Sequence, residues 1–207
     1  MPGPTVEIYD VLPSFVLGFH GCDRALAERV FAGRTTLRAS DNDYDWLGHG
    51  VYFWENNPQR ALNYARLLKK FPIRAKQRIR QPAVVGAIID PGRCLNLMDA
   101  QFIRLLKQSY AHLRALHQVA GKPLPRNRPV AGSRDLLLRD LDCAVIETLH
   151  SINREQGVPP FDSARGAFIE GGPAYPGAGV HDASHIQICV RNPRCIKGYF
   201  RVLKSVD

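Results

Sequence analysis

The chain has 207 residues, of which 45% are hydrophobic, and this is enough apolar material for one well-cored domain. No apolar run approaches the length that crosses a bilayer, and the N-terminal segment MPGPTVEIYD is acidic and polar where a secretory signal is basic and then apolar. The sequence therefore predicts a cytoplasmic protein with no membrane partner, while delivery to another cell as an effector stays open.

Charge is the most informative bulk property of the chain, which carries a formal net charge of +9. Six basic residues and no acidic one lie between Lys69 and Arg80, and a second basic stretch runs from Lys122 to Arg134. Such fields attract polyanions, so a nucleic acid is an expected partner, with a solvated surface as the alternative.

The five cysteines are odd in number and include no CxxC pair. A disulfide framework and a structural zinc site both need paired or clustered cysteines, so neither is expected. The sequence predicts reduced thiols packed as small apolar side chains, and no bound metal. Cys22 follows the GFHG segment and could also act as a nucleophile, but a packed thiol is the favoured interpretation.

Apolar periodicity and turn residues predict a single α+β domain over residues 1–207, with a helical insertion at about 95–160. The β core is expected to be split and mostly antiparallel, because a β-rich end must pair with a β-rich start. Asp23 is expected to cap the first helix and Asn57 to begin the second. Strands are expected at 14–20, 35–39, 51–54, 83–90, 167–170, 185–190 and 195–203, and helices at 25–31, after 57, after 99 and over about 134–153.

Three short segments carry the candidate chemistry: GFHG at 18–21, GVYFW at 50–54 and HIQI at 185–188. The first places a histidine at a strand end where glycine leaves the backbone accessible. The second is followed by a helix that carries Tyr64. Gln187 lies in an otherwise apolar strand, and an amide buried without partners costs about 1–3 kcal/mol. This glutamine therefore needs a partner, and a ligand is one.

Together and in this order, the three segments resemble the ADP-ribosyltransferase superfamily, in the branch related to diphtheria toxin and poly(ADP-ribose) polymerases. That branch carries a histidine on its first strand, a tyrosine on a following strand and usually a glutamate on a late strand. The resemblance covers residues 15–65 and 165–205. The matching positions are His20, Tyr52 and Gln187, with Tyr64 at the place of a second stacking tyrosine.

The resemblance implies an enzyme that moves ADP-ribose from NAD to a macromolecular acceptor and releases nicotinamide, with NAD as the consumed substrate and no metal. His20 would bind the adenosine-side ribose, the Gly21 backbone would bind the nicotinamide amide, and two tyrosines would sandwich the nicotinamide ring. Arg165 is a candidate for binding the pyrophosphate or a target phosphate bidentately. The implied NAD-binding residues are His20, Gly21, Ser40, Tyr52, Tyr64 and Arg165.

Gln187 departs from the family's usual glutamate, which both hydrogen-bonds the ribose and supplies negative charge. Cleavage leaves a ribosyl oxocarbenium, so a polar or negative group is needed beside that ribose. Either the neutral amide suffices, or a carboxylate arrives from elsewhere. Glu170 is the candidate, because it opens the loop that leads into the Gln187 strand, and it would supply charge or act as general base for the acceptor. The catalytic set is His20, Tyr52, Gln187 and Glu170.

The acceptor is expected to be a nucleic acid, RNA or DNA, or a protein, and a toxin-like role would add an antitoxin or immunity protein as a partner. The alternatives are a non-catalytic NAD- or ADP-ribose-binding module, an NAD glycohydrolase and an RNA 2′-phosphotransferase. The two histidines of HDASH, His181 and His185, resemble a zinc-protease motif. That motif needs a helix, whereas the flanking segments predict loop and strand.

Overall fold

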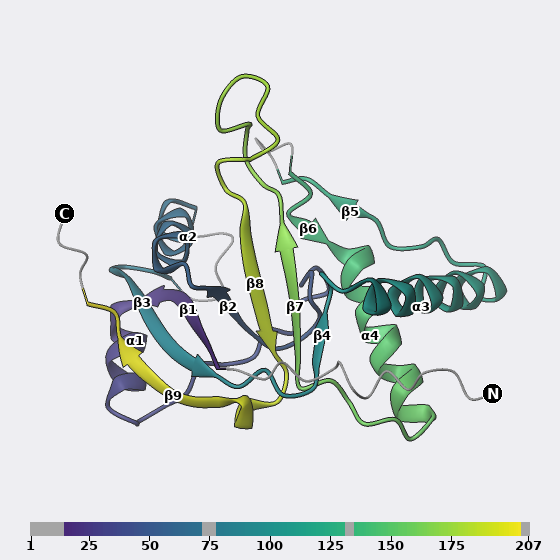
Figure 1. The fold of residues 1–207 in the computed structure, drawn as a ribbon, viewed down its shortest axis with the longest axis horizontal. Coiled ribbons are helices and arrows are strands. Elements are labelled where there is room, and N and C mark those ends of the chain that lie inside the picture. The colour runs from purple at the N-terminus through teal and green to yellow at the C-terminus, as the bar shows by residue number, and fades with distance from the viewer. Residues whose placement is uncertain (1–14, 72–77, 131–134, 204–207) are drawn as a thin grey trace.

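The computed structural model describes residues 15–71, 78–130 and 135–203, and its centre is a seven-stranded sheet (Figure 1). The strands of this sheet are β1 (Val16–Asp23), β2 (Val51–Glu55), β3 (Pro82–Ile89), β4 (Cys94–Asn96), β7 (Ser163–Phe168), β8 (His185–Val190) and β9 (Ile196–Arg201). Their order is β4-β7-β8-β2-β1-β3-β9, and every neighbouring pair is antiparallel except β4 with β7. The predicted α+β class with a mostly antiparallel sheet is therefore confirmed.

The two ends of the chain meet in the sheet, as the sequence predicts. The late strand β8 pairs with the early strand β2, and the last strand β9 pairs with β3. The middle of the chain adds a separate antiparallel pair and two of the four described α-helices. These middle elements are α3 (Ala100–Val119), β5 (Asn127–Arg128), β6 (Leu138–Arg139) and α4 (Asp140–Glu155). The other two helices, α1 (Arg24–Phe31) and α2 (Pro58–Lys70), lie earlier in the chain.

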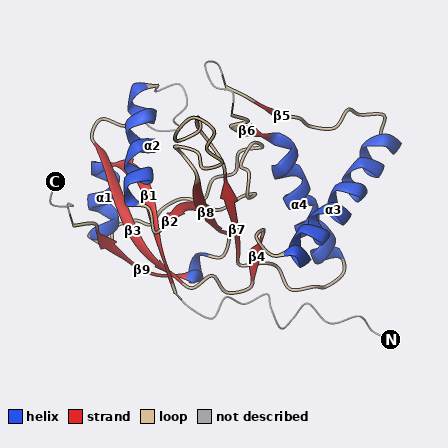
Figure 2. Cartoon of the chain, turned by 45° about the horizontal axis from the view of Figure 1, so that its top comes forward, coloured by secondary structure: helices blue, strands red, loops and turns tan. Residues whose placement is uncertain are grey.

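The helices cover both faces of the sheet. Figure 2 shows α1 and α2 at one end of the sheet and α3 and α4 at the other. Alternate residues of a strand point to opposite faces, so Phe53 of β2 packs in the cluster that contains α1, whereas Trp54 packs against Ala61 of α2. On the same face as α2, the helices α3 and α4 pack against β4, β7 and β8. Among the described residues, no helix is both long enough and apolar enough to cross a bilayer.

Side-chain caps begin three of the helices where the sequence predicts. The Asp23 carboxylate accepts a hydrogen bond from Ala25 N at 2.9 Å, and the Asn57 side chain accepts one from Arg60 N at 2.9 Å. These caps satisfy backbone donors that have no partner inside the helix. Asp99 caps α3 in the same way, by accepting from Gln101 N at 2.8 Å.

The strand expected at 35–39 is wrong. This segment has no regular secondary structure, and only Ser40 beside it forms an isolated bridge, with Gly50. A strand needs a neighbour for its backbone, and both edges of β2 are already paired, with β1 and β8. Leu37 of this segment is nevertheless buried in the core, which accounts for its apolar character.

The helix expected over about 134–153 instead runs from Asp140 to Glu155. Residue 134 lies outside the described residues, and Leu138 and Arg139 pair with β5. The Asn127 side chain accepts hydrogen bonds from the first turn of α4, from Leu141 N at 3.0 Å and Asp142 N at 3.2 Å. A capping group from strand β5 therefore sets the start of this helix, and no local pattern reveals it.

Candidate functional site

The three segments that carry the sequence motifs meet in one row across the sheet. Phe19 of the GFHG segment pairs with Trp54 of β2, and Trp54 pairs with Gln187 of β8. Residues in register on neighbouring antiparallel strands have their Cβ atoms about 4.5–5.5 Å apart. Segments separated by more than a hundred residues in the sequence thus form one continuous surface, which α2 covers at its β1 side.

His20 lies where β1 separates from β2. Its Nδ1 is 2.8 Å from the carbonyl oxygen of Tyr52. A carbonyl oxygen only accepts, so Nδ1 carries the proton and Nε2 is left as an acceptor. Burial lowers the pKa of His20, which keeps the ring neutral at pH 7. The ring can therefore accept a hydrogen bond from a hydroxyl group, as the ribose contact implied by the resemblance requires.

The backbone N–H and C=O of Gly21 point to the side of β1 where β2 no longer pairs with it. β1 pairs with β3 along its whole length, but within the described chain it pairs with β2 only at Gly18 and Phe19. The carbonyl of Leu17 accepts from Asn56 N on the β2 side, and Arg24 N donates to Gln81 on the β3 side. Because successive residues of a strand alternate in direction, Gly21 turns its N–H and C=O toward β2. Gly21 thus presents one donor, its N–H, and one acceptor, its C=O, just past Phe19, the last residue of β1 that pairs with β2.

Glycine is required at position 21 because α2 passes close to it. A Cβ added there would lie 2.1 Å from the carbonyl oxygen of Ala61. The side of Gly21 that faces α2 is therefore closed, and its backbone edge is the part directed at β2. The GFHG segment combines this edge with the acceptor nitrogen of His20 at one place.

Buried polar atoms without hydrogen-bond partners gather around the same row. An unpaired buried polar group costs about 1–3 kcal/mol, so a cluster of such groups points to a missing partner. Gln187 is 3% exposed and Glu170 is 4% exposed, and each keeps its Oε1 unpaired. The described side chains here with such an atom are Trp54 (Nε1), Arg60 (Nε), Arg139 (Nε), Glu170 (Oε1), His185 (Nε2) and Gln187 (Oε1).

Glu170 is held at this cluster by an ion pair with α2. Arg60 donates to Glu170 Oε2 at 2.7 Å, and His185 Nδ1 lies 3.9 Å from the same oxygen. Burial raises the pKa of Glu170, while the attraction of Arg60 opposes that rise. The structure thus places a carboxylate beside the start of the Gln187 strand, although the sequence alone gives only its position in the loop.

Aromatic rings connect this cluster to the surface. Trp46 stacks on Phe168 with ring centroids 3.9 Å apart, and His185 lies 5.7 Å from Phe168. Trp54 follows at 6.2 Å from His185, and Tyr64 lies 4.9 Å from Trp54. Tyr64 ends the series and is 39% exposed, so it is the ring with room to move.

Tyr52 and Tyr64 make different contacts in this structure. The Tyr52 hydroxyl donates to the carbonyl of Gly48 at 2.7 Å and accepts from Leu47 N at 2.9 Å, which ties β2 to the preceding loop. Tyr64 lies against Trp54. A ring inserted between Tyr64 and Trp54, whose centroids are 4.9 Å apart, would need about 7 Å, twice the optimal carbon–carbon separation. Tyr64 must therefore swing outward before a planar ligand can stack there.

Arg165 and Ser40 are not brought to this cluster. Arg165 pairs with Ile188, on the face opposite to Gln187, and its guanidinium bonds both oxygens of Glu55 at 2.5 and 2.8 Å. A guanidinium engaged in this way is not available to a phosphate. The Ser40 hydroxyl accepts from Asn42 Nδ2 at 2.8 Å within the loop that precedes β2.

Arg60 and His185 are site residues that the sequence analysis did not assign. Arg60 precedes Tyr64 by four residues on α2, which places both on one side of the helix. His185 precedes Gln187 by two residues on β8, which places both on one face of the sheet. These two spacings are the signals that point to them.

The histidine pair of HDASH does not have the geometry of a zinc-protease motif. His181 lies in a loop with its Nδ1 2.9 Å from the Gly171 carbonyl, and His185 begins β8. Zinc coordination by this motif requires both histidines on one turn of a helix. In the described part of the chain, no group of three or more His, Cys, Asp or Glu side chains is arranged to hold a metal ion.

All five cysteines are buried and none forms a disulfide, which confirms the prediction of packed thiols. Burial raises the pKa of Cys22 to about 12, so its thiol stays protonated. Cys143 Sγ lies 3.8 Å from His49 Nε2, but burial likewise raises the pKa of Cys143 to about 12. Neither thiol is therefore poised as a nucleophile.

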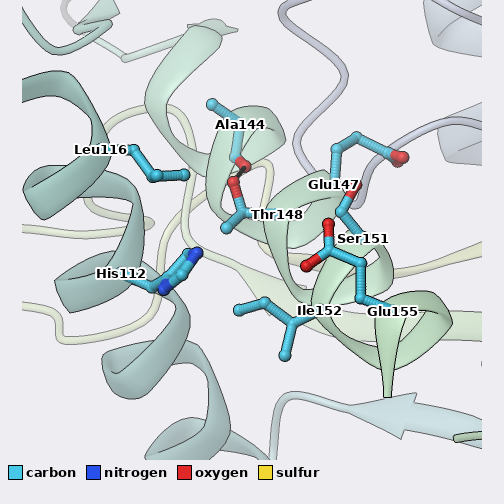
Figure 3. Close-up of a pocket in the computed structure, with 8 residues that line it drawn as sticks. All are labelled: His112, Leu116, Ala144, Glu147, Thr148, Ser151, Ile152 and Glu155. Atoms are coloured by element: carbon cyan, nitrogen blue, oxygen red, sulfur yellow. Dashed lines mark hydrogen bonds between the residues drawn. The ribbon is translucent and has the colours of Figure 1, made fainter. Parts of the chain in front are cut away.

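A hollow of about 340 Å³ lies between α3 and α4, away from the row described above (Figure 3). In it, the Thr148 hydroxyl donates to the Ala144 carbonyl at 2.7 Å. Glu147, also at its wall, accepts from Arg191 at 2.5 Å. No described residue that lines this hollow keeps a buried side-chain polar atom unpaired. The unpaired groups around Gln187, rather than this hollow, therefore mark the candidate site.

Comparison of the chain with family models, with curated proteins and with solved structures returns no significant match.

Proposed function

We propose that this protein is an NAD-dependent ADP-ribosyltransferase, with a fold of that superfamily in which the β core splits where β1 leaves β2. It would cleave NAD between nicotinamide and ribose and transfer ADP-ribose to a macromolecular acceptor. The observation that carries the proposal is the backbone edge of Gly21, next to the acceptor nitrogen of His20. One donor and one acceptor on the same residue complement a primary carboxamide, which offers one acceptor and one donor in return.

The nicotinamide ring would then lie beside the aromatic rings of α2 and β2. Tyr64 is the partly exposed ring and Trp54 is the buried one. A pyridinium carries positive charge, which is favourable over an aromatic face. His20 would accept a hydrogen bond from the adenosine-side ribose, and Gln187 would hydrogen-bond the reacting ribose.

The chemistry requires that the C1′–N bond breaks with its electron pair going to nicotinamide, which leaves as a neutral molecule. Positive charge then develops on the ribose. Gln187 supplies no charge to offset it, whereas Glu170 keeps one oxygen unpaired within the same cluster. An anion fixed in a site of low dielectric is worth more than one in water. We assign to Glu170 the negative charge that the glutamine lacks.

The arrangement of arginines does not favour an RNA 2′-phosphotransferase. That chemistry would use several arginines around one phosphate, but the arginines nearest the sheet are each bonded to a carboxylate. Arg60 bonds Glu170, Arg165 bonds Glu55, and Arg191 bonds Glu147. A binding module without turnover is the second candidate, because Gln187 stands where the family usually has glutamate.

The deciding experiment measures nicotinamide release from NAD by purified protein, with and without RNA, DNA or cell lysate. Wild-type protein is expected to release nicotinamide, and Glu170→Gln is expected to lower the rate by about 10²-fold, as for other charge-stabilising groups in active sites. Tight NAD binding without nicotinamide release under any condition would contradict the proposed enzymatic activity and would favour a non-catalytic binding module. Release that proceeds equally well without any acceptor would identify a glycohydrolase.

Glu55→Gln is the matched control for this experiment. Glu55 is also a poorly exposed carboxylate paired with an arginine, but it lies on the opposite face of the sheet. The same substitution therefore removes a comparable ion pair away from the proposed site. Its nicotinamide release, measured per folded molecule, is expected to match the wild type.

A further inference from the structure

The imidazole of His185 has a fixed tautomer and an unused nitrogen. Its Nδ1 lies 2.7 Å from the carbonyl oxygen of Ala183, which can only accept, so Nδ1 carries the proton. The lone pair is therefore on Nε2, and this atom is buried without a hydrogen-bond partner. The residue is 8% exposed. An acceptor atom that is held in place, enclosed and unpaired needs an explanation beyond packing.

The groups that face His185 come from every element around it. Glu170 lies at 3.9 Å, at the end of β7. Burial lowers the pKa of His185 to about 4, the hydrogen bond to Ala183 opposes this, and the two nearby cations, Arg60 of α2 and Arg139 of β6, lower it further. The rings of Trp46, Trp54 and Phe168 enclose the imidazole at 5.7–6.2 Å. The imidazole is therefore neutral at pH 7, with its Nε2 lone pair available.

Glu170 and His185 stand at the two ends of one exposed loop, residues 171–184. Ala183 N donates to the Glu170 carbonyl at 3.0 Å, and the Ala183 carbonyl accepts from His185. Figure 1 shows this loop projecting beyond the ends of β7 and β8. The buried carboxylate and the buried imidazole thus lie together at the base of this loop.

We propose that His185 Nε2 accepts the proton of the acceptor nucleophile during ADP-ribosyl transfer. This inference rests on the proposed function. The nucleophile's O–H or N–H gives its proton to Nε2, its lone pair forms the bond to C1′, and the C1′–N bond breaks with its electron pair going to nicotinamide. The resulting imidazolium is stabilised by the Glu170 carboxylate beside it.

The two groups have separate tasks because their bonds differ. Glu170 has one oxygen engaged in the ion pair with Arg60, which opposes the rise in its pKa that burial causes and holds the carboxylate as a fixed charge. His185 makes only the bond that fixes its tautomer. A carboxylate next to an imidazole that becomes charged is the arrangement by which other enzymes hold and stabilise a general base. His185 is therefore the base, and Glu170 is its counter-charge as well as that of the ribose.

The test compares two nucleophiles with His185→Gln, in which the amide nitrogen reaches about as far as Nε2 but accepts no proton. Nicotinamide release from NAD is measured with cell lysate as the source of acceptor and, separately, with sodium azide. Azide is an anion that attacks without losing a proton. His185→Gln is expected to be slower by about 10²-fold with lysate and to regain release with azide.

Each outcome decides one point. Undiminished nicotinamide release by His185→Gln with lysate would overturn the assignment of His185 as the base. A loss of release that azide does not restore would show that His185 has a structural role, and this would overturn the assignment too. No release by the wild type with either nucleophile would overturn the proposed function, and this inference with it. His150→Gln is the matched control, because His150 is another buried histidine with unpaired nitrogens and a pKa lowered to about 4. A measured protonation of Nε2 in the free protein at pH 7, by nitrogen NMR, would also contradict the assignment.

Discussion

Trp54 and Gln187 lie directly opposite each other on β2 and β8, and each keeps a buried polar atom without a partner. The indole N–H is a donor and the amide Oε1 is an acceptor, yet the described structure gives neither of them a hydrogen bond. Natural proteins rarely leave such groups unpaired in a core. We therefore expect the pair to serve as a binding surface that is maintained at the expense of stability.

Replacement of Gln187 by leucine is expected to separate stability from function. Leucine has a similar volume and no polar atom to leave unpaired, so the free energy of unfolding should rise by about 1 kcal/mol or stay unchanged. NAD binding and nicotinamide release should fall together. Urea unfolding and isothermal calorimetry with NAD measure the two effects.

Ser163→Ala is the control for Gln187→Leu. The Ser163 hydroxyl is fully buried but satisfied, because it donates to the Pro91 carbonyl at 2.7 Å. Its loss should lower stability by about 1 kcal/mol and leave NAD binding unchanged. A destabilised Gln187→Leu would show that the glutamine is a structural group.

Parts of the fold follow from sequence because their causes are local. Asp23 caps α1, and the alternation in HIQICV makes β8. The start of α4 could not be predicted, since it depends on Asn127 thirteen positions before Asp140, the first residue of that helix. The missing strand at 35–39 has the same kind of cause, because whether a segment pairs depends on which edges of the sheet are left.

The candidate site likewise contains residues that local sequence indicates and contacts that it does not. The sequence indicates His20, Tyr52 and Gln187 by motif and Glu170 by its place at a loop, and the site remains a prediction. Ion pairs could not be anticipated, since Arg165 meets its partner across 110 positions of the sequence. A pair of that separation is fixed by the topology of the sheet and not by a local pattern.

The Gly21 backbone predicts discrimination between nicotinamide and nicotinate. A carboxamide can accept from the Gly21 N–H and donate to the Gly21 C=O, whereas a carboxylate has no donor and would leave that carbonyl unpaired. An unpaired buried acceptor costs about 1–3 kcal/mol, so nicotinate should inhibit NAD cleavage about 5-fold to 150-fold more weakly. Inhibition constants for the two compounds against NAD turnover measure this. Equal inhibition would place the pyridine ring elsewhere.

The two tyrosines should respond differently to substitution. Tyr52→Phe keeps the ring and removes a hydroxyl that bonds Gly48 and Leu47, so it should lower the free energy of unfolding by about 1–2 kcal/mol with little effect on turnover. Tyr64→Ala removes a partly exposed ring, so it should leave stability nearly unchanged and weaken NAD binding. Thermal unfolding together with KM for NAD distinguishes them. The reverse pattern would make Tyr52 the stacking ring.

The outer face of α3 is the surface we expect to bind a nucleic-acid acceptor. The helix contains no acidic residue, and Arg104, Lys107 and Arg114 are exposed on one side of it. Reversal of these three charges to glutamate should weaken RNA binding and reduce the slope of log K against log salt by about 2–3, as three lost phosphate contacts require. Fluorescence anisotropy at several salt concentrations gives the slope.

A triple reversal on α1 and the turn after it controls for net charge. Arg24, Arg29 and Arg34 are also exposed, and α1 lies at the other end of the sheet from α3. This variant has the same total charge as the α3 variant, so general electrostatic attraction falls equally in both. Equal losses of RNA binding would mean that net charge, and not a surface on α3, attracts the nucleic acid.

Stability should fall on acidification through two buried histidines. The pKa values of His150 and His185 are lowered to about 4 in the folded state by burial, against 6.5 for an unperturbed imidazole. Above pH 6.5 both states are neutral and contribute nothing. Below it the unfolded chain binds protons that the folded chain does not, so stability declines from about pH 6.5 to about pH 4 and then levels off. At pH 5 each histidine should cost about 2 kcal/mol relative to pH 7. Urea unfolding at the two pH values measures the loss, and His150→Leu should remove about half of what the pair contributes. A loss as large in His150→Leu as in the wild type would mean that His150 stays neutral in both states.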